Sequence, residues 1–319
     1  MQEVMVSVCC TTYNHEKYVR DALEGFVDQE TDFLYEVIVH DDASTDGTVE
    51  IIREYAEKYP DIIKPIYQEE NQYSKQVNIY AQYIYPNTKG KYIALCEGDD
   101  YWIDKHKLQI QVDFMEKHTG FSACVHNTCF LDTRSGEERI FYGTEEKELG
   151  ILDTIYEGGQ SFHTSSLLFY REYALEQPEF YHFTTKMKDY PMAIYLSYSG
   201  KIKYFPQVMS VYRVLTEGSW SMAYLDLGRQ IESLQELIRM LEGFDLYSDK
   251  QYHKEVQKSM RDKRFLLAVL QGDFETIHSE EMKEYYQKIP FVGKLGIFAR
   301  EHLGLLYKMY RKVIDKSGK

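Results

Sequence analysis

The sequence predicts an α/β fold in which a mostly parallel β-sheet is flanked by helices and is followed by a helical C-terminal region. Apolar runs of strand length alternate with helical patterns over the first 130 residues or so, which is typical of a parallel sheet covered on both faces. From about Leu225 the apolar residues recur at helical spacing, with an interruption at Pro290. We therefore expect one domain over residues 1–224 and a helical region over 225–319. A chain of 319 residues with 44% hydrophobic residues can bury a large core.

The elements of the first domain follow one another in a regular order. Residues 5–10 are mostly apolar and predict a strand, and residues 19–26 then place four apolar side chains on one face of a helix. A second strand is predicted at 37–39, and a helix follows through 51–55. The alternation continues through four further segments and a strand, at 62–67, 80–85, 92–95, 108–115 and 121–130. Residues 132–160 are polar and rich in Gly and Glu, and we expect them to run over the surface.

Two pairs of acidic residues follow predicted strands. Asp99 and Asp100 come after the apolar run 91–96, and Asp41 and Asp42 come after the run 35–40. In open α/β sheets ligands bind outside the carboxyl ends of the strands, so the two pairs can converge on one site. Carboxylates suit Mg²⁺ or Mn²⁺, and Mg²⁺ commonly takes one or two of them together with substrate phosphates. The alternative is that each pair forms only a solvated turn.

Composition restricts the class of protein. The net charge of −14 argues against nucleic acid as a partner. The five cysteines lie mostly in apolar runs without CxxC spacing, which predicts reduced core residues in a cytoplasmic protein. We find no signal-peptide pattern and no apolar stretch long enough to span a membrane. No G-x-G-x-x-G follows the first strand, so dinucleotide oxidoreduction is not predicted.

The C-terminal residues differ in charge from the rest of the chain. Residues 288–319 contain eight Lys or Arg against two acidic residues, a net charge of +6 that leaves −20 on the remainder. Apolar residues recur there at spacings of three and four between basic ones, although three glycines weaken the helical pattern. A basic amphipathic helix can lie on an anionic membrane surface, at the inner face of the cell membrane for example. The alternative is a last helix docked on the protein with its charges in solvent.

Three motifs together resemble the inverting nucleotide-sugar glycosyltransferases with the GT-A fold, often called family 2. They are residues 6–14 (Val-Ser-Val-Cys-Cys-Thr-Thr-Tyr-Asn), the acidic turn 41–48, and the Glu-Gly-Asp-Asp sequence at 97–100 followed by Trp102. Their order and spacing match the family over roughly residues 4–220. Two later segments, 188–192 and 211–221, look like signatures of bacterial members that build surface polysaccharides.

The resemblance implies a fold and a donor site. The fold would be the Rossmann-like GT-A domain, with a nucleotide-sugar half over about 1–130 and an acceptor half over about 131–224. Thr12, Tyr13 and Asn14 would line the nucleotide pocket, and Asp42 would hold the base or ribose. From the residues alone, Tyr13 and Asn14 also fit a strand-to-helix turn, with Asn14 as an N-cap.

A loop at 71–75 is a further candidate for donor binding. Asn71 and Lys75 lie in a segment rich in Gln and Asn, and they could reach the base or a phosphate. Arg213 is open to two interpretations, binding a phosphate or bracing the loop ahead of it. Residues 163–166 (His-Thr-Ser-Ser) either face the acceptor or form a polar strand start.

The resemblance also implies the metal site and the catalytic base. Asp99 and Asp100 would correspond to the acidic motif that binds metal and ribose, with Asp100 as a direct ligand of Mn²⁺ or Mg²⁺. Asp189 would be the general base, unless it is only an ion-paired helix start. Many relatives carry a histidine two residues after the Tyr-Arg pair, where this chain has Leu215. Since leucine cannot ligate a metal, water, Glu217 or phosphate oxygens would have to complete the coordination shell.

The predicted activity is therefore metal-dependent, inverting transfer of a sugar from a nucleotide-diphosphate sugar, with UDP as the default nucleotide. The acceptor would be a hydroxyl of a glycan or of a lipid-linked glycan. One alternative is a catalytically degenerate scaffold that only binds nucleotide sugar, which Leu215 mildly favours. A sugar nucleotidyltransferase is a weaker alternative, because residues 9–20 lack the glycine-rich loop such enzymes usually carry.

Overall fold

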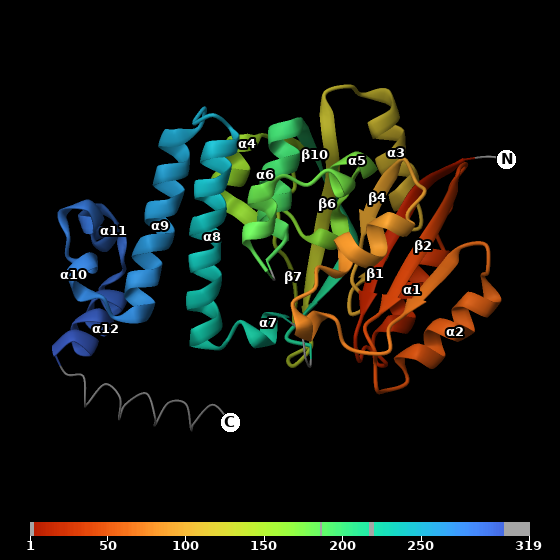
Figure 1. Ribbon diagram of the computed structural model, residues 1–319, viewed down its shortest axis with the longest axis horizontal. Coiled ribbons are helices and arrows are strands. Elements are labelled where there is room, and N and C mark those ends of the chain that lie inside the picture. The colour runs from red at the N-terminus through yellow and green to blue at the C-terminus, as the bar shows by residue number, and fades with distance from the viewer. Residues whose placement is uncertain (1–2, 186, 217–219, 303–319) are drawn as a thin grey trace. The chain divides into compact units, whose positions relative to one another are not determined.

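The computed structural model describes residues 3–185, 187–216 and 220–302, and the chain separates into two compact units, Met1–Ala223 and Tyr224–Lys319 (Figure 1). The first unit is built on one ten-stranded sheet with the order β3-β2-β1-β4-β9-β6-β10-β5, while β7 pairs with β6 and β8 pairs with β10. Its strands are β1 (Val4–Thr12), β2 (Leu34–Asp41), β3 (Ile63–Tyr67), β4 (Tyr92–Leu95), β5 (Tyr101–Trp102), β6 (Phe121–Asp132), β7 (Glu138–Ile140), β8 (Lys147–Leu149), β9 (Leu168–Tyr170) and β10 (Lys201–Val214).

The strand directions confirm the predicted α/β class. β1, β2, β3 and β4 pair in parallel, and β6 pairs in parallel with β10. β9 is antiparallel to both β4 and β6, so β4 and β6 run in the same direction. The remaining short strands, β5, β7 and β8, are antiparallel to their partners. β7, β8 and a helix lie within the polar segment 132–160, which therefore extends the sheet.

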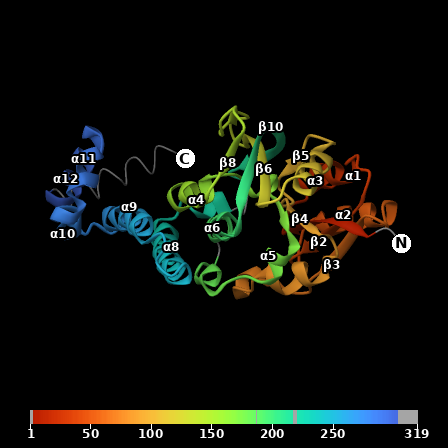
Figure 2. The same cartoon turned by 90° about the horizontal axis from the view of Figure 1, so that it is seen from above.

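Helices cover both faces of this sheet. The helices of the first unit are α1 (Val19–Val27), α2 (Thr48–Lys58), α3 (Lys107–Lys117), α4 (Ile151–Glu157), α5 (Arg171–Leu175), α6 (Asp189–Ser199) and α7 (Trp220–Ala223). Residues 80–84 form a π-helical turn, and short 3₁₀ helices include Tyr73–Lys75, Gly158–Gln160 and Thr164–Ser166. α3 and α6 lie on opposite sides of β6, as the turned view shows (Figure 2).

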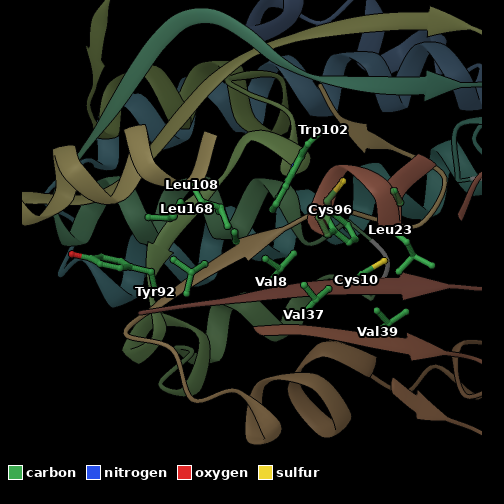
Figure 3. Packing of buried hydrophobic residues seen from close by; sticks show 14 of the residues in the cluster. Val8, Cys10, Leu23, Val37, Val39, Tyr92, Cys96, Trp102, Leu108 and Leu168 are labelled. Atoms are coloured by element: carbon green, nitrogen blue, oxygen red, sulfur yellow. The ribbon is translucent and has the colours of Figure 1, made fainter. Parts of the chain in front are cut away.

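The core follows from the two-residue period of the strands. Val8 and Cys10 of β1 point to one face and pack with Val37, Val39 and Leu23 (Figure 3). The intervening residues point to the other face, where a second cluster contains Cys9, Ile38, Ile93, Leu95 and three residues of α6 (Met192, Ala193, Leu196). All five cysteines are free thiols, and four of them are fully buried. Because both faces are buried, the central strands are nearly continuous apolar runs.

The second unit is helical. Its helices are α8 (Leu227–Tyr247), α9 (His253–Gln271), α10 (Phe274–Ile277), α11 (Lys283–Lys288) and α12 (Phe291–His302). A small core formed by Phe265, Ala268, Ile277, Met282 and Ile297 holds the last helices together. No helix among the described residues is both long enough and apolar enough to cross a membrane. The predicted basic segment 288–319 is described only as far as residue 302.

Candidate functional site

The carboxyl ends of three neighbouring strands carry the predicted donor residues. β1 pairs in parallel with β2 on one side, with Thr12 opposite Asp41, and with β4 on the other, with Cys9 opposite Leu95. Because parallel strands end at the same edge, the acidic pairs after β2 and β4 lie on either side of the end of β1. The sequence predicts this common edge.

The two acids after β2 have different surroundings. Asp41 forms a turn, because its carboxylate accepts hydrogen bonds from the Ser44 backbone N–H (2.9 Å) and from the Thr12 hydroxyl (3.1 Å). Asp42 is 2% exposed and accepts hydrogen bonds from the backbone N–H groups of Gln72 (2.8 Å) and Tyr73 (3.0 Å). In this structure Asp42 therefore fixes the loop that follows β3. Its contact with a base or ribose remains a prediction.

The residues after β1 divide between turn formation and exposure. Thr12 is buried, whereas Tyr13, the first residue after β1, is 45% exposed. Asn14 has a φ of +56°, and its side-chain oxygen accepts a hydrogen bond from the Thr45 backbone N–H at 2.8 Å. The alternative prediction that Asn14 is the N-cap is wrong, because Tyr18 occupies that position in α1. Of the three, Tyr13 is the side chain best placed to contact a ligand.

The candidate loop residues Asn71 and Lys75 both have protein partners. The Asn71 amide donates to the Asp42 carbonyl oxygen (3.3 Å), and its oxygen accepts from the Ser74 backbone N–H (2.7 Å). Lys75 forms an exposed ion pair with Glu70. Exposed ion pairs contribute little to stability, so this one can open to release Lys75 for an anionic ligand.

The loop after β4 requires a glycine. A Cβ atom on Gly98 would lie 2.4 Å from the Thr12 side-chain methyl, so any other residue would push the loop away from β1. The Gly98 backbone N–H donates to the Thr11 carbonyl oxygen at 2.9 Å. This close approach places Asp99 and Asp100 directly beside the end of β1.

The end of β10 holds both carboxylates. The backbone N–H of Arg213 donates to Asp100 Oδ1 at 2.9 Å, and the Thr216 hydroxyl donates to Asp99 Oδ2 at 3.0 Å. The Arg213 guanidinium donates to the Asp99 carbonyl oxygen (2.9 Å) and pairs with Asp21. Arg213 therefore braces the acidic loop in this structure. The contribution of Thr216 was not predicted, because a threonine after a strand has no distinctive sequence signal.

The electrostatics of the acidic loop favour a cation. Burial, and then the negative charges of Asp99 and Glu97, hold the pKa of Asp100 well above its usual range. Burial and the charge of Asp99 also raise the pKa of Glu97. Among the described residues, Asp99 Oδ1 and Asp100 Oδ2 have no hydrogen-bond donor within bonding distance. A cation placed between these oxygens would relieve the repulsion.

The protein donors alone do not form a complete metal site. No group of three or more His, Cys, Asp or Glu side chains in the described parts of the chain is arranged to hold a metal ion. Two carboxylate oxygens fit the arrangement in which Mg²⁺ or Mn²⁺ takes its remaining ligands from water and substrate phosphates. Leu215 adds no ligand and has a φ of +63°, while Glu217 lies outside the described residues.

His163 is a further residue beside the carboxylates. Its Nε2 lies 3.8 Å from Asp100 Oδ2, and burial lowers the pKa of the ring to about 3. The ring stacks on Tyr212 with a centroid distance of 4.0 Å. Sequence reasoning identified residues 163–166 as polar but did not place His163 beside Asp100, because about 60 residues separate the two positions.

Asp189 lies at the first position of α6, close to the segment Gly158–Gln160. Its Oδ1 accepts a hydrogen bond from the Tyr190 backbone N–H at 2.9 Å, and burial raises the pKa of the carboxyl. Burial raises the pKa of the Tyr142 and Tyr181 hydroxyls, and the nearby negative charge of Asp189 raises it further. A carboxylate with a raised pKa in an aromatic setting is a stronger proton acceptor than an exposed one.

Aromatic rings extend from the acidic loop toward Asp189. Phe130 lies 6.1 Å from the ring of His163, and 5.2 Å from that of Tyr212. The centroid of the Phe130 ring also lies 5.2 Å from that of Phe141 and 6.0 Å from that of Tyr142. Tyr142 is in turn close enough to Asp189 for the charge of Asp189 to raise its pKa. The two predicted catalytic regions are therefore joined by a continuous set of rings from β6, β10 and the segment after β7.

Comparison with known proteins agrees with this arrangement. The family model for glycosyl transferase family 2 matches residues 7–186, more than half of the chain. The chain belongs to glycosyl transferase family 2.

This family 2 chain is similar to several curated proteins. It is 32% identical over 225 residues to the uncharacterized protein Rv1520 of Mycobacterium tuberculosis, covering 69% of this chain and 62% of the relative. It is 36% identical over 119 residues to the putative teichuronic acid biosynthesis glycosyltransferase TuaG of Bacillus subtilis, covering 37% of this chain and 45% of the relative. The chain thus spans less than two thirds of the length of these relatives.

Solved structures show the same fold. The Staphylococcus aureus TarS fragment 1–349 in complex with UDP-GlcNAc matches with a TM-score of 0.59 at 18% identity, covering 93% of this chain and 81% of that one. The same fragment in complex with UDP matches with a TM-score of 0.57 at 17% identity. The GT-A architecture predicted for this family 2 chain is therefore confirmed.

Proposed function

We propose that this chain is a metal-dependent, inverting glycosyltransferase that transfers a sugar from a nucleotide-diphosphate sugar to a hydroxyl of a glycan or lipid-linked glycan. The main support is the pair Asp99 and Asp100. Asp100 is buried, Arg213 of β10 and Thr216 hold the two carboxylates, and each carboxylate keeps one oxygen without a donor among the described residues. Family membership supports glycosyl transfer. UDP is the proposed nucleotide, because the TarS fragment was solved in complex with UDP and with UDP-GlcNAc.

Each side chain at the edge would have a distinct task. Tyr13 would stack against the base, and Asp42, Asn71 and Lys75 would bind the nucleoside and phosphates after a modest rearrangement of their loop. Asp99 and Asp100 would hold Mn²⁺ or Mg²⁺, which supplies positive charge to the diphosphate leaving group. The nucleotide pocket would also include Thr12 and Asn14, which in this structure support the surrounding turns.

Asp189 would accept the proton of the acceptor hydroxyl. Its carboxylate lies at the amino end of α6, where its raised pKa suits a general base. A single in-line displacement would follow: the acceptor oxygen bonds to the anomeric carbon, the bond to the diphosphate breaks, and the proton moves to Asp189. No covalent enzyme intermediate is needed, and the anomeric configuration inverts.

Nucleotide binding tests this proposal directly. Calorimetry with UDP, GDP and CMP, each with Mn²⁺ and with EDTA, should show tight binding of one nucleotide only when Mn²⁺ is present. Binding of no nucleotide by a folded sample would refute the donor site. Metal-dependent nucleotide binding without turnover of any UDP-sugar would instead support the degenerate scaffold.

We also propose that residues 288–319 contact an anionic membrane. α12 supports this, because Phe291 (78%), Val292 (79%), Leu295 (55%) and Phe298 (51%) are exposed although they are apolar. Ile297, in contrast, is buried against the core of the second unit. The exposed residues are followed by a sequence with five Lys or Arg between 303 and 319. An apolar helix face beside basic residues matches the surface of a bilayer that contains anionic lipids.

A further inference from the structure

The turn that contains His163 is fixed against the acidic loop. The Thr164 hydroxyl donates to Glu97 Oε2 at 3.1 Å, one residue before Gly98 of the Glu-Gly-Asp-Asp sequence. Behind the loop, the indole N–H of Trp102 donates to the Ser165 carbonyl oxygen at 2.9 Å. Both contacts join residues more than 60 positions apart. The turn and the acidic loop are therefore held in one fixed relation.

The contacts of the ring determine which nitrogen of His163 carries the proton. Nδ1 accepts a hydrogen bond from the backbone N–H of Ser165 at 3.2 Å. A backbone N–H can only donate, so Nδ1 must be unprotonated, and in the neutral ring the proton is on Nε2. Nε2 is the nitrogen that faces Asp100 Oδ2. The structure thus directs an N–H group, and no lone pair, toward the carboxylate.

The ring has little freedom to turn away from Asp100. Tyr212 stacks on it with an interplanar angle of 25°. The Ser165 hydroxyl lies 2.8 Å from Nδ1 and 2.9 Å from the Ser210 hydroxyl, which is in turn 3.1 Å from the Thr128 hydroxyl. These three hydroxyls are buried, and such hydroxyl networks hold the groups attached to them.

We propose that His163 is a positioning residue for the cation site, and that its Nε2–H holds Asp100 Oδ2 in the orientation in which this carboxylate takes the cation. Arg213 N–H already holds Oδ1 at 2.9 Å, so the carboxylate would be fixed at both oxygens. Each oxygen keeps a further lone pair for the cation. The 3.8 Å separation closes to a hydrogen bond when donor and cation bind, as catalytic hydrogen bonds often do. This inference rests on the proposed metal-dependent donor site.

Two substitutions separate the ring's contacts. His163→Asn keeps an acceptor near the position of Nδ1, and so keeps the turn, but removes the donor that faces Asp100. His163→Gln places an amide N–H near the position of Nε2 but lacks an acceptor at the position of Nδ1. Both variants must first show the thermal unfolding temperature of a folded protein. Calorimetry then measures UDP binding at a series of Mn²⁺ concentrations, and again in EDTA.

We expect His163→Asn to weaken the apparent Mn²⁺ affinity by about 10–100-fold, the usual effect of losing a group that orients a metal ligand. His163→Gln should recover most of this loss, and UDP binding in EDTA should be the same in all three proteins. Equal Mn²⁺ affinity in His163→Asn and the wild type would overturn the inference, as would a His163→Gln variant as weak as His163→Asn. Failure of the proposed function would be visible separately, as wild-type UDP binding that does not respond to Mn²⁺.

Discussion

Gly159 provides a test of the proposed base that leaves the carboxylate chemically intact. A Cβ atom at this position would lie 2.1 Å from Asp189 Oδ2 and 2.6 Å from its Cγ, whereas real Cβ contacts essentially never fall below 3.0 Å. Gly159→Ala must therefore displace the Asp189 carboxylate by about 1 Å. A misplacement of this size at a reacting group can cost about 100-fold in rate. We expect a fall of that order in turnover.

The assay follows UDP release from a UDP-sugar, with water or acceptor glycan as the nucleophile, and calorimetry follows donor binding. Donor affinity and the unfolding temperature should change little, because the proposed donor residues lie at the ends of β1, β2 and β4 and in the loop after β3, in other segments than Gly159. Gly143→Ala is the matched control, since a Cβ at that position meets no atom within 4 Å. Turnover of Gly159→Ala within threefold of that of Gly143→Ala would show that the position of Asp189 does not limit the reaction.

Three further predictions concern charge and surface. Asp100→Asn should abolish Mn²⁺-dependent UDP binding, and an unchanged Mn²⁺ response would contradict its role as ligand. The same substitution should raise the unfolding temperature without metal, by about 2–4 °C for each kcal/mol gained, because Asp100 is the buried member of three acids that repel one another, with Glu97 and Asp99. Turnover should fall as the pH drops through the raised pKa of Asp189, since protonation removes the base. A turnover that stays constant down to about pH 4, the ordinary pKa range of aspartate, would exclude Asp189 as the base. Leu295→Ser should weaken binding to vesicles containing anionic lipid but leave the second unit folded, whereas Leu246→Ser, at a still more exposed apolar site on α8, should have no effect. Equal losses in both variants would argue against a specific face.

Period and spacing in the sequence predict the first unit well. The helix face of α1 and the buried strands β1, β2 and β4 follow directly from the apolar pattern, because their burial is two-sided and their turns carry clear polar signals. The shared sheet edge of the two acidic pairs follows from the same alternation. β7 and β8 could not be predicted, since each has only three residues. β7 is stabilised by pairing with the preceding strand β6, and β8 by pairing with the distant strand β10.

Motifs identify acids more reliably than they identify what surrounds them. Asp42 was expected to face a ligand, yet the structure shows both of its oxygens bound by backbone N–H groups from the loop 72–73. Asn14 was open between two roles, and its hydrogen bond to Thr45 depends on a turn about 30 residues away. Long-range contacts of this kind decide the function of a polar side chain, and a single sequence carries no record of them.

Leu215 shows how the chain maintains the acidic loop without the expected histidine. A leucine at a φ of +63° adopts a backbone conformation that costs roughly 1–2 kcal/mol, because its Cβ lies too near the following carbonyl oxygen. The next residue, Thr216, is buried with its hydroxyl on Asp99 Oδ2. The strain at 215 is thus offset by a charge-assisted hydrogen bond at 216, typically about 1.5–3 kcal/mol. Position 215 therefore contributes to the site through its backbone, and the orientation of the two acids depends on Arg213 and Thr216 on either side of it.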